Sequence, residues 1–189
     1  MSKVGFKSTS YLKSDSFLVG NAAFSPNSYE SIQTVTVGTA QSTITFSSIP
    51  ATFTHLQIRA MSLNSSSGTD IRIRFNSDTG SNYRTHYLYG QGSSAVSGGG
   101  ASTYITMGLT SLSSGNPEVL VTDILDYTST TKNKTIRSLT GVDDNGSGYL
   151  VLYTGLWFNT PAAITQIDLS ANTGNFNQYS SFALYGIKG

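Results

Sequence analysis

The chain has 189 residues, of which 11% are charged, with a formal net charge of +1 and no cysteine. So few charged side chains favour a β-rich structural protein over a freely soluble helical enzyme. The near-neutral charge argues against nucleic acid as a partner, and the lack of cysteine excludes disulfides and thiolate metal sites. No apolar run approaches the roughly 20 residues of a membrane span, so we expect no membrane partner.

Residues 1–30 show neither a strand period nor a helix period, and they combine three lysines with several large aromatic side chains. One interpretation is a disordered terminus. So many aromatic residues are unusual in disordered chains, however, so we predict an extended N-terminal arm that lies along a neighbouring protein. Its docking side chains would be Phe6, Tyr11, Phe17 and Phe24. The interrupted apolar run at 17–24 argues against a signal peptide.

From residue 31 the sequence alternates in the manner of β-strands. Residues 31–37 and 42–46 are predicted to form a hairpin around a turn at 38–41. Residues 91–102 contain three consecutive glycines and are predicted to be a flexible loop or an interface segment. Further strands before residue 110 are expected at 54–63, 70–75, 83–89 and 104–109.

Three strands at 119–127, 134–142 and 149–158 are separated by turn-forming segments, which predicts an antiparallel meander. Alternation places Val119, Val121 and Leu125 on one face, together with Asp123 and Tyr127. Neither face is uniformly polar, so we expect this part of the sheet to be covered on both sides, by a second sheet or by a neighbouring subunit. The last strands are expected at 164–170 and 180–187.

About ten strands with regular turns and no amphipathic helix predict an all-β fold, an antiparallel β-sandwich of jelly-roll type. Residues 31–189 would form this single domain. A repeat solenoid is disfavoured because no segment recurs at a fixed period.

Catalytic groups are scarce in the sequence, which contains only Glu30, Glu118, His55 and His86 as glutamates and histidines. A glycosidase pair would have to join the arm to a loop, and no G-x-S-x-G motif supports a serine hydrolase. We therefore expect no enzyme activity and no cofactor, with a hydrolase as the distant alternative.

Two loops, at 76–80 and 143–147, combine oxygen ligands with a glycine, as a calcium loop does. Neither continues to the acidic twelfth residue of an EF-hand, where Tyr87 and Thr154 stand instead. Asp and Asn in such loops usually close turns through their own side chains, so no metal ligand is assigned.

Carbohydrate binding is the stronger possibility, because sugar sites on β-sandwiches stack aromatic rings on pyranose faces and hold hydroxyl groups with polar side chains. Aromatic residues on strands more often pack in the core, which is the competing interpretation. Tyr149 and Tyr153 are further ring candidates. The predicted glycan contacts are Tyr83, Tyr87, Tyr89, Trp157, Asp78 and Asp143.

Three stretches, at 54–59, 74–83 and 177–188, together resemble virion structural proteins of tailed bacteriophages. This group includes small capsid-surface proteins and modules of tail fibres. The resemblance implies a non-enzymatic capsid decoration or cement protein on the virion surface, at the head rather than the tail. Its partners would be the major capsid protein or another virion protein and itself, as a homotrimer. The alternative is a tail-fibre or tail-tip module that recognises host-surface polysaccharide.

Overall fold

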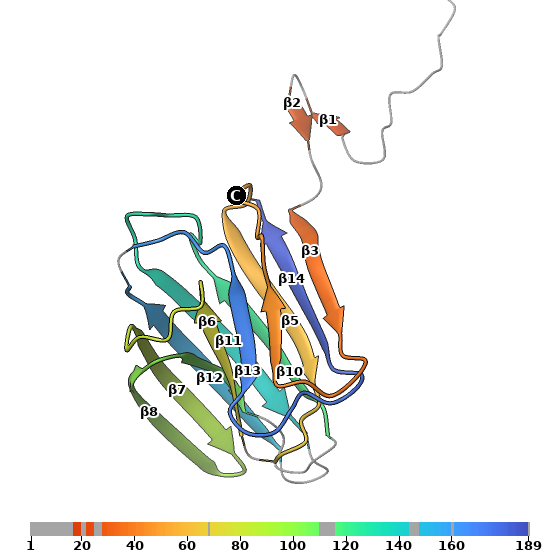
Figure 1. Ribbon diagram of the computed structural model, residues 1–189, viewed down its shortest axis with the longest axis vertical. Coiled ribbons are helices and arrows are strands. Elements are labelled where there is room, and N and C mark those ends of the chain that lie inside the picture. Colours follow the sequence, from red (N-terminus) through yellow and green to blue (C-terminus); the bar gives the residue numbers. More distant parts are fainter. Residues whose placement is uncertain are drawn as a thin grey trace, which may run out of the picture.

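The computed structural model describes residues 28–67, 69–109, 116–143, 148–159 and 161–188, and the backbone of short strands at 17–19 and 22–24. These residues form two packed antiparallel sheets of eight and four strands, with no helix among them (Figure 1). The fold is therefore all-β, an antiparallel β-sandwich, as the alternation predicts. The jelly-roll connectivity and the extended arm stay predictions.

The large sheet contains, in spatial order, β3 (Tyr29–Thr36), β14 (Ser181–Ile187), β5 (His55–Ser62), β10 (Glu118–Ile124), β11 (Lys134–Val142), β12 (Tyr149–Trp157), β7 (Tyr83–Gln91) and β8 (Ser94–Ser102). The small sheet contains β4 (Thr43–Phe46), β13 (Ile167–Ala171), β6 (Asp70–Phe75) and β9 (Ile105–Leu109). Ahead of both, β1 (Phe17–Val19) pairs with β2 (Ala22–Phe24). The meander is confirmed, because β11 pairs with both β10 and β12.

The predicted hairpin between 31–37 and 42–46 is wrong. Strand β3 pairs with β14 in the large sheet, whereas β4 pairs with β13 in the small sheet. Directly after β3, the backbone N–H of the buried Val37 donates a hydrogen bond of 2.8 Å to the carbonyl of Ser180, the residue just before β14. The chain therefore crosses between the layers at the point where the local pattern suggests a turn.

The predicted loop at 91–102 is also wrong over most of its length. Residues 94–102 form β8, which pairs residue for residue with β7. Backbone hydrogen bonds need no particular side chain, so a glycine-rich segment can extend a sheet when a regular neighbouring strand is available. This strand is the main reason why the sandwich has twelve strands rather than about ten.

The core lies between the sheets, where buried residues alternate along each central strand, as in the pattern of β11. Strand β10 ends at Ile124, three residues earlier than predicted, because Asp126 takes a left-handed conformation with φ of 48°. Tyr127 consequently turns inwards and is fully buried. The opposite face of the meander leaves Val119, Val121 and Leu125 exposed, and no described element covers it.

Candidate ligand-binding hollow

The edge strand of the small sheet, β9, packs mainly on β11 and β12, and β7 and β8 extend the large sheet past it. Beyond β9 the inner face of the large sheet is open, and β8 is exposed on both faces. A concave site of about 430 Å³, here called the tyrosine hollow, lies in the corner between the two sheets. Its lining residues are Asp70, Tyr87, Tyr89, Val96, Thr106, Leu109 and Tyr153.

Strand alternation and strand pairing together place three tyrosines in the lining. Tyr87 and Tyr89 share the inner face of β7, and Tyr153 is the direct cross-strand neighbour of Tyr87. The rings of Tyr87 and Tyr153 lie 6.1 Å apart. Because Tyr153 is only 3% exposed while Tyr87 is 37% exposed, a buried ring supports a ring that faces solvent.

Gly98 on β8 lies directly opposite Tyr87. A Cβ atom at this position would come within 2.6 Å of the Tyr87 hydroxyl oxygen, so only glycine allows the ring to lie across β8. A second hollow of about 260 Å³ also contacts Tyr87 and is lined by Thr85, Tyr87, Gly99, Gly100, Ala101, Ser102, Tyr104 and Thr106. Tyr87 is therefore shared by two adjoining hollows.

Asp70 is the only carboxylate among the residues that line the two hollows. Its Oδ2 lies 3.6 Å from a guanidinium nitrogen of Arg72, whose guanidinium in turn sits 3.9 Å above the Tyr104 ring. Burial raises the pKa of Tyr153, and the negative charge of Asp70 raises it further. The Tyr153 phenol therefore stays neutral at physiological pH, and the hollow offers neutral hydroxyl groups beside one carboxylate.

This arrangement suits the binding of a polyhydroxylated ligand. Tyrosine combines an apolar ring face with a polar tip, and ligand sites usually pair such apolar walls with a few polar groups that fix orientation. Glycoside hydrolysis normally needs two carboxyl groups on either side of the bond, whereas these linings supply Asp70 alone.

Two of the predicted glycan contacts are wrong. Tyr83 and Trp157 are 0% and 2% exposed, and their rings stack 6.4 Å apart beside Phe75. They lie on the parts of β7 and β12 that the small sheet covers, so they belong to the core. Tyr87 and Tyr89, farther along β7, do line the hollow.

Asp78 serves the same core cluster. Its carboxylate accepts hydrogen bonds from the Trp157 indole at 2.7 Å, the Asn159 amide at 3.0 Å and the Gly80 backbone at 2.8 Å. Burial acts to raise the pKa of Asp78, but the hydrogen bonds outweigh it and the pKa is lowered. Asp78 therefore closes the 76–80 turn and anchors Trp157, which corrects its predicted role as a glycan contact.

The remaining sequence-based sites are not decided by the geometry. Asp143 is exposed, but residues 144–147 of its loop lie outside the described residues. Phe6, Tyr11 and the side chains of Phe17 and Phe24 lie outside them as well. Among the described residues, no three acidic, histidine or cysteine side chains gather as a metal site.

Asp70, Val96, Thr106 and Leu109 were not expected at this site. Asp70, Thr106 and Leu109 come from β6 and β9 of the small sheet, and only the packing of that sheet on β12 and β7 brings them beside Tyr87. No spacing in the sequence signals this juxtaposition. Val96 falls in the segment that was predicted to be a loop.

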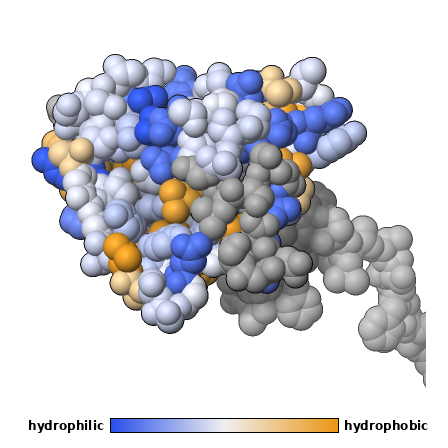
Figure 2. Space-filling model, turned by 90° about the horizontal axis from the view of Figure 1, so that it is seen from below, coloured by the Kyte–Doolittle hydropathy of each residue, from blue (hydrophilic) through white to orange (hydrophobic). Residues whose placement is uncertain are grey.

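A second surface lies on the outside of the large sheet. Across β10, β11, β12 and β7 a row of directly opposed residues reads Val121, Leu139, Leu152 and Leu88. Val119 and Leu150, each 58% exposed, widen this row into what we call the apolar outer face. By contrast, the lower end of the molecule is largely hydrophilic with separate hydrophobic patches (Figure 2).

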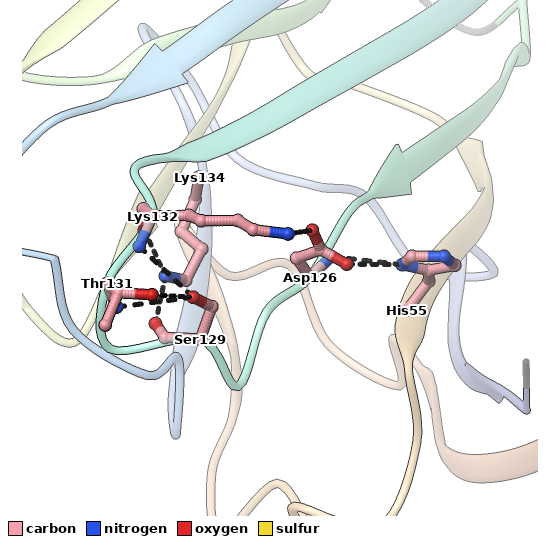
Figure 3. A network of polar contacts seen from close by, with 6 residues as sticks. All are labelled: His55, Asp126, Ser129, Thr131, Lys132 and Lys134. Atoms are coloured by element: carbon pink, nitrogen blue, oxygen red, sulfur yellow. Dashed lines mark hydrogen bonds and ion pairs between the residues drawn. The ribbon is translucent and has the colours of Figure 1, made fainter.

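A polar cluster lies at the β10–β11 connection (Figure 3). Asp126 accepts a hydrogen bond from the Lys132 ammonium at 2.7 Å, and its backbone N–H donates to His55 Nδ1 at 3.0 Å. The buried Lys134 donates to the backbone carbonyls of Ser129 and Lys132. These groups satisfy one another, so the cluster holds a turn and offers little to a ligand.

Comparison of the chain with protein-family models, with curated proteins and with solved structures gives no match. Within the described residues, no helix is long and apolar enough to cross a membrane.

Proposed function

We propose that this chain is a non-enzymatic recognition module of a tailed-phage virion, which binds a host-surface saccharide in the tyrosine hollow. The observation that carries the proposal is the exposed Tyr87 ring, supported by Tyr153 and flanked by Asp70 and Thr106. The virion setting comes from the resemblance of residues 54–59, 74–83 and 177–188.

The physical argument has two parts. The C–H face of a pyranose can cover the exposed apolar face of Tyr87 and remove it from water. Its hydroxyl groups can then donate to the Asp70 carboxylate and exchange hydrogen bonds with Thr106, which fixes the orientation of the sugar. The second hollow, which Tyr87 also lines, gives room for a second sugar unit.

A glycan array probed with the full chain tests this proposal. Tyr87→Ala should weaken binding about tenfold or more, because loss of the stacked ring costs on the order of 1.5–3 kcal/mol. Tyr29→Ala is the matched control, since Tyr29 is also an exposed strand tyrosine but lies on the opposite edge strand. Binding that survives Tyr87→Ala, or that disappears equally in Tyr29→Ala, would contradict the proposal.

The second candidate is capsid decoration and cementing, which the sequence puts first. The apolar outer face supports it, because exposed apolar patches of this kind commonly mark protein–protein contacts. Cementing would bury this face, or the arm with Phe6, Tyr11, Phe17 and Phe24, against the major capsid protein. The two functions use opposite faces of one sheet and are compatible.

A further inference from the structure

The edges of the two sheets are protected unequally. Exposed strand edges carry unpaired N–H and C=O groups, and proteins usually blunt them with charges, bulges, proline or very short strands. Strand β3 carries Glu30, which forms an ion pair with Lys188 just after β14, and its pairing with β14 shifts register between Leu184 and Tyr185. The small-sheet edge strands β4 and β9 have only four and five residues, and the pairing of β9 is also bulged.

Strand β8 has none of these protections. It runs for nine residues in unbroken register with β7 and contains no charged residue and no proline. Within the described part of the chain, no further strand pairs with its outer edge. Both faces are exposed along most of its length, so another strand can approach without obstruction.

A second copy of β8 fits this edge. The strand reads S-A-V-S-G-G-G-A-S, in which valine is the largest side chain. We propose that β8 pairs antiparallel with β8 of a second copy of this chain, around a two-fold axis at Gly98. Ser94 of one copy would then face Ser102 of the other, and Ala95 would face Ala101. A two-fold interface of this kind is self-complementary, so each copy would pair the open edge of the other.

The remaining pairs in this register each set a side chain of one copy against a glycine of the other. Val96 of one copy would face Gly100 of the other, and Ser97 would face Gly99. Val96 is 50% exposed and is the one branched side chain of β8, so its pairing partner must leave room for it. A Cβ atom at Gly100 would meet no atom within 4 Å, so the space above it is free to receive the valine.

This pairing changes the ligand site as well as the oligomeric state. Directly opposed residues of antiparallel strands lie on the same face, so Val96 of one copy reaches the second hollow of the other, which Gly100 lines. The hollows of the two copies would adjoin on one continuous face. Two saccharide units bound side by side raise the apparent affinity through effective concentration.

Sedimentation equilibrium of the full chain, combined with cysteine cross-linking, tests the proposal. We expect an even number of copies, and Ser97→Lys should raise the dissociation constant at least tenfold without lowering the Tm of the monomer, measured well below the dissociation constant. Since the native chain has no cysteine, the double variant Ala95→Cys with Ala101→Cys should form intermolecular disulfides on mild oxidation. Each single variant is the control and should not cross-link efficiently.

Three outcomes would overturn the inference. They are a monomer at all concentrations, a trimer such as the phage resemblance implies, and a double variant that cross-links no better than its single-cysteine controls. None of these readouts involves a glycan, so failure of this inference is distinguishable from failure of the saccharide proposal.

Discussion

Glu118 is fully buried at the start of β10, an environment that disfavours its ionised form. The Thr140 hydroxyl donates to Oε1, whereas Oε2 has no hydrogen-bond partner in the described structure. Burial raises the pKa of Glu118 to about 8, although the hydrogen bonds from Thr140 and the Leu109 backbone oppose this shift. The residue is thus a source of pH-dependent stability rather than a catalytic acid, because solvent does not reach it.

The consequence for stability has a definite sign. Because the pKa is higher in the folded chain than the ordinary 4.5, the folded state binds more protons between pH 4.5 and about 8. The free energy of unfolding should therefore fall across this window as pH rises, by at most about 1.4 kcal/mol per pH unit. Glu118→Gln should remove this slope in urea unfolding measured from pH 4 to 9.

The matched control is Glu30→Gln, because Glu30 is exposed in its ion pair with Lys188. This variant should keep the pH slope of the native chain. If Glu118→Gln kept it too, the buried carboxyl would not be its source.

Gly155 on β12 shows how one element sets the geometry of the site. A Cβ atom there would lie 2.4 Å from Cγ2 of Ile105 on β9, so the glycine lets β9 pack directly on the large sheet. Strand β9 in turn supplies Thr106 and Leu109 to the wall of the tyrosine hollow. The depth of the hollow therefore depends on a small residue outside its lining.

Gly155→Ala should lower the free energy of unfolding by about 1–3 kcal/mol, because the added methyl group overpacks this contact. Ile105→Ala should also destabilise the fold, but the double variant should lose less than the sum of the two, since each change relieves the other. Gly38→Ala is the control and should be nearly neutral, because its Cβ atom would meet nothing within 4 Å. Strict additivity in the chemical denaturation data would contradict this account.

For the whole molecule, the main asymmetry is between the two faces of the large sheet. The inner face is covered by the small sheet except beyond β9, whereas the outer face presents Val121, Leu139 and Leu152 to solvent. The expectation that a second sheet covers one side of the meander is confirmed. A neighbouring subunit or capsid surface on the other side stays a prediction.

Leu139→Gln combined with Leu152→Gln should leave the free energy of unfolding within about 0.5 kcal/mol, because both side chains are substantially exposed. If the outer face cements the chain to a capsid, the same double variant should fail to rejoin particles depleted of the native chain. Thr154→Gln, an exposed change on the same face, is the control and should rejoin them. Unimpaired attachment of the leucine variant would remove the outer face from the cementing hypothesis.

The sequence was informative wherever the signal is local. Period-2 alternation identified β10, β11 and β12, and it placed Tyr87 and Tyr89 on one face of β7. Alternation follows from backbone geometry alone, so it predicted the all-β class and the common face of these two tyrosines. It also predicted the turn at 76–80, where Asp78 closes the loop through its own side chain.

Tertiary structure decided what depends on distant segments meeting. Alternation does not say which sheet a strand joins, so β3 and β4 separated into different layers, and backbone pairing with β7 made a strand of the glycine-rich β8. The four strands of the small sheet cover Tyr83 and Trp157 but stop short of Tyr87, although all three are aromatic residues in alternating strand segments of the sequence. A tyrosine becomes a core residue or a candidate ligand contact according to what lies above it, and that is a property of packing between segments far apart in the chain.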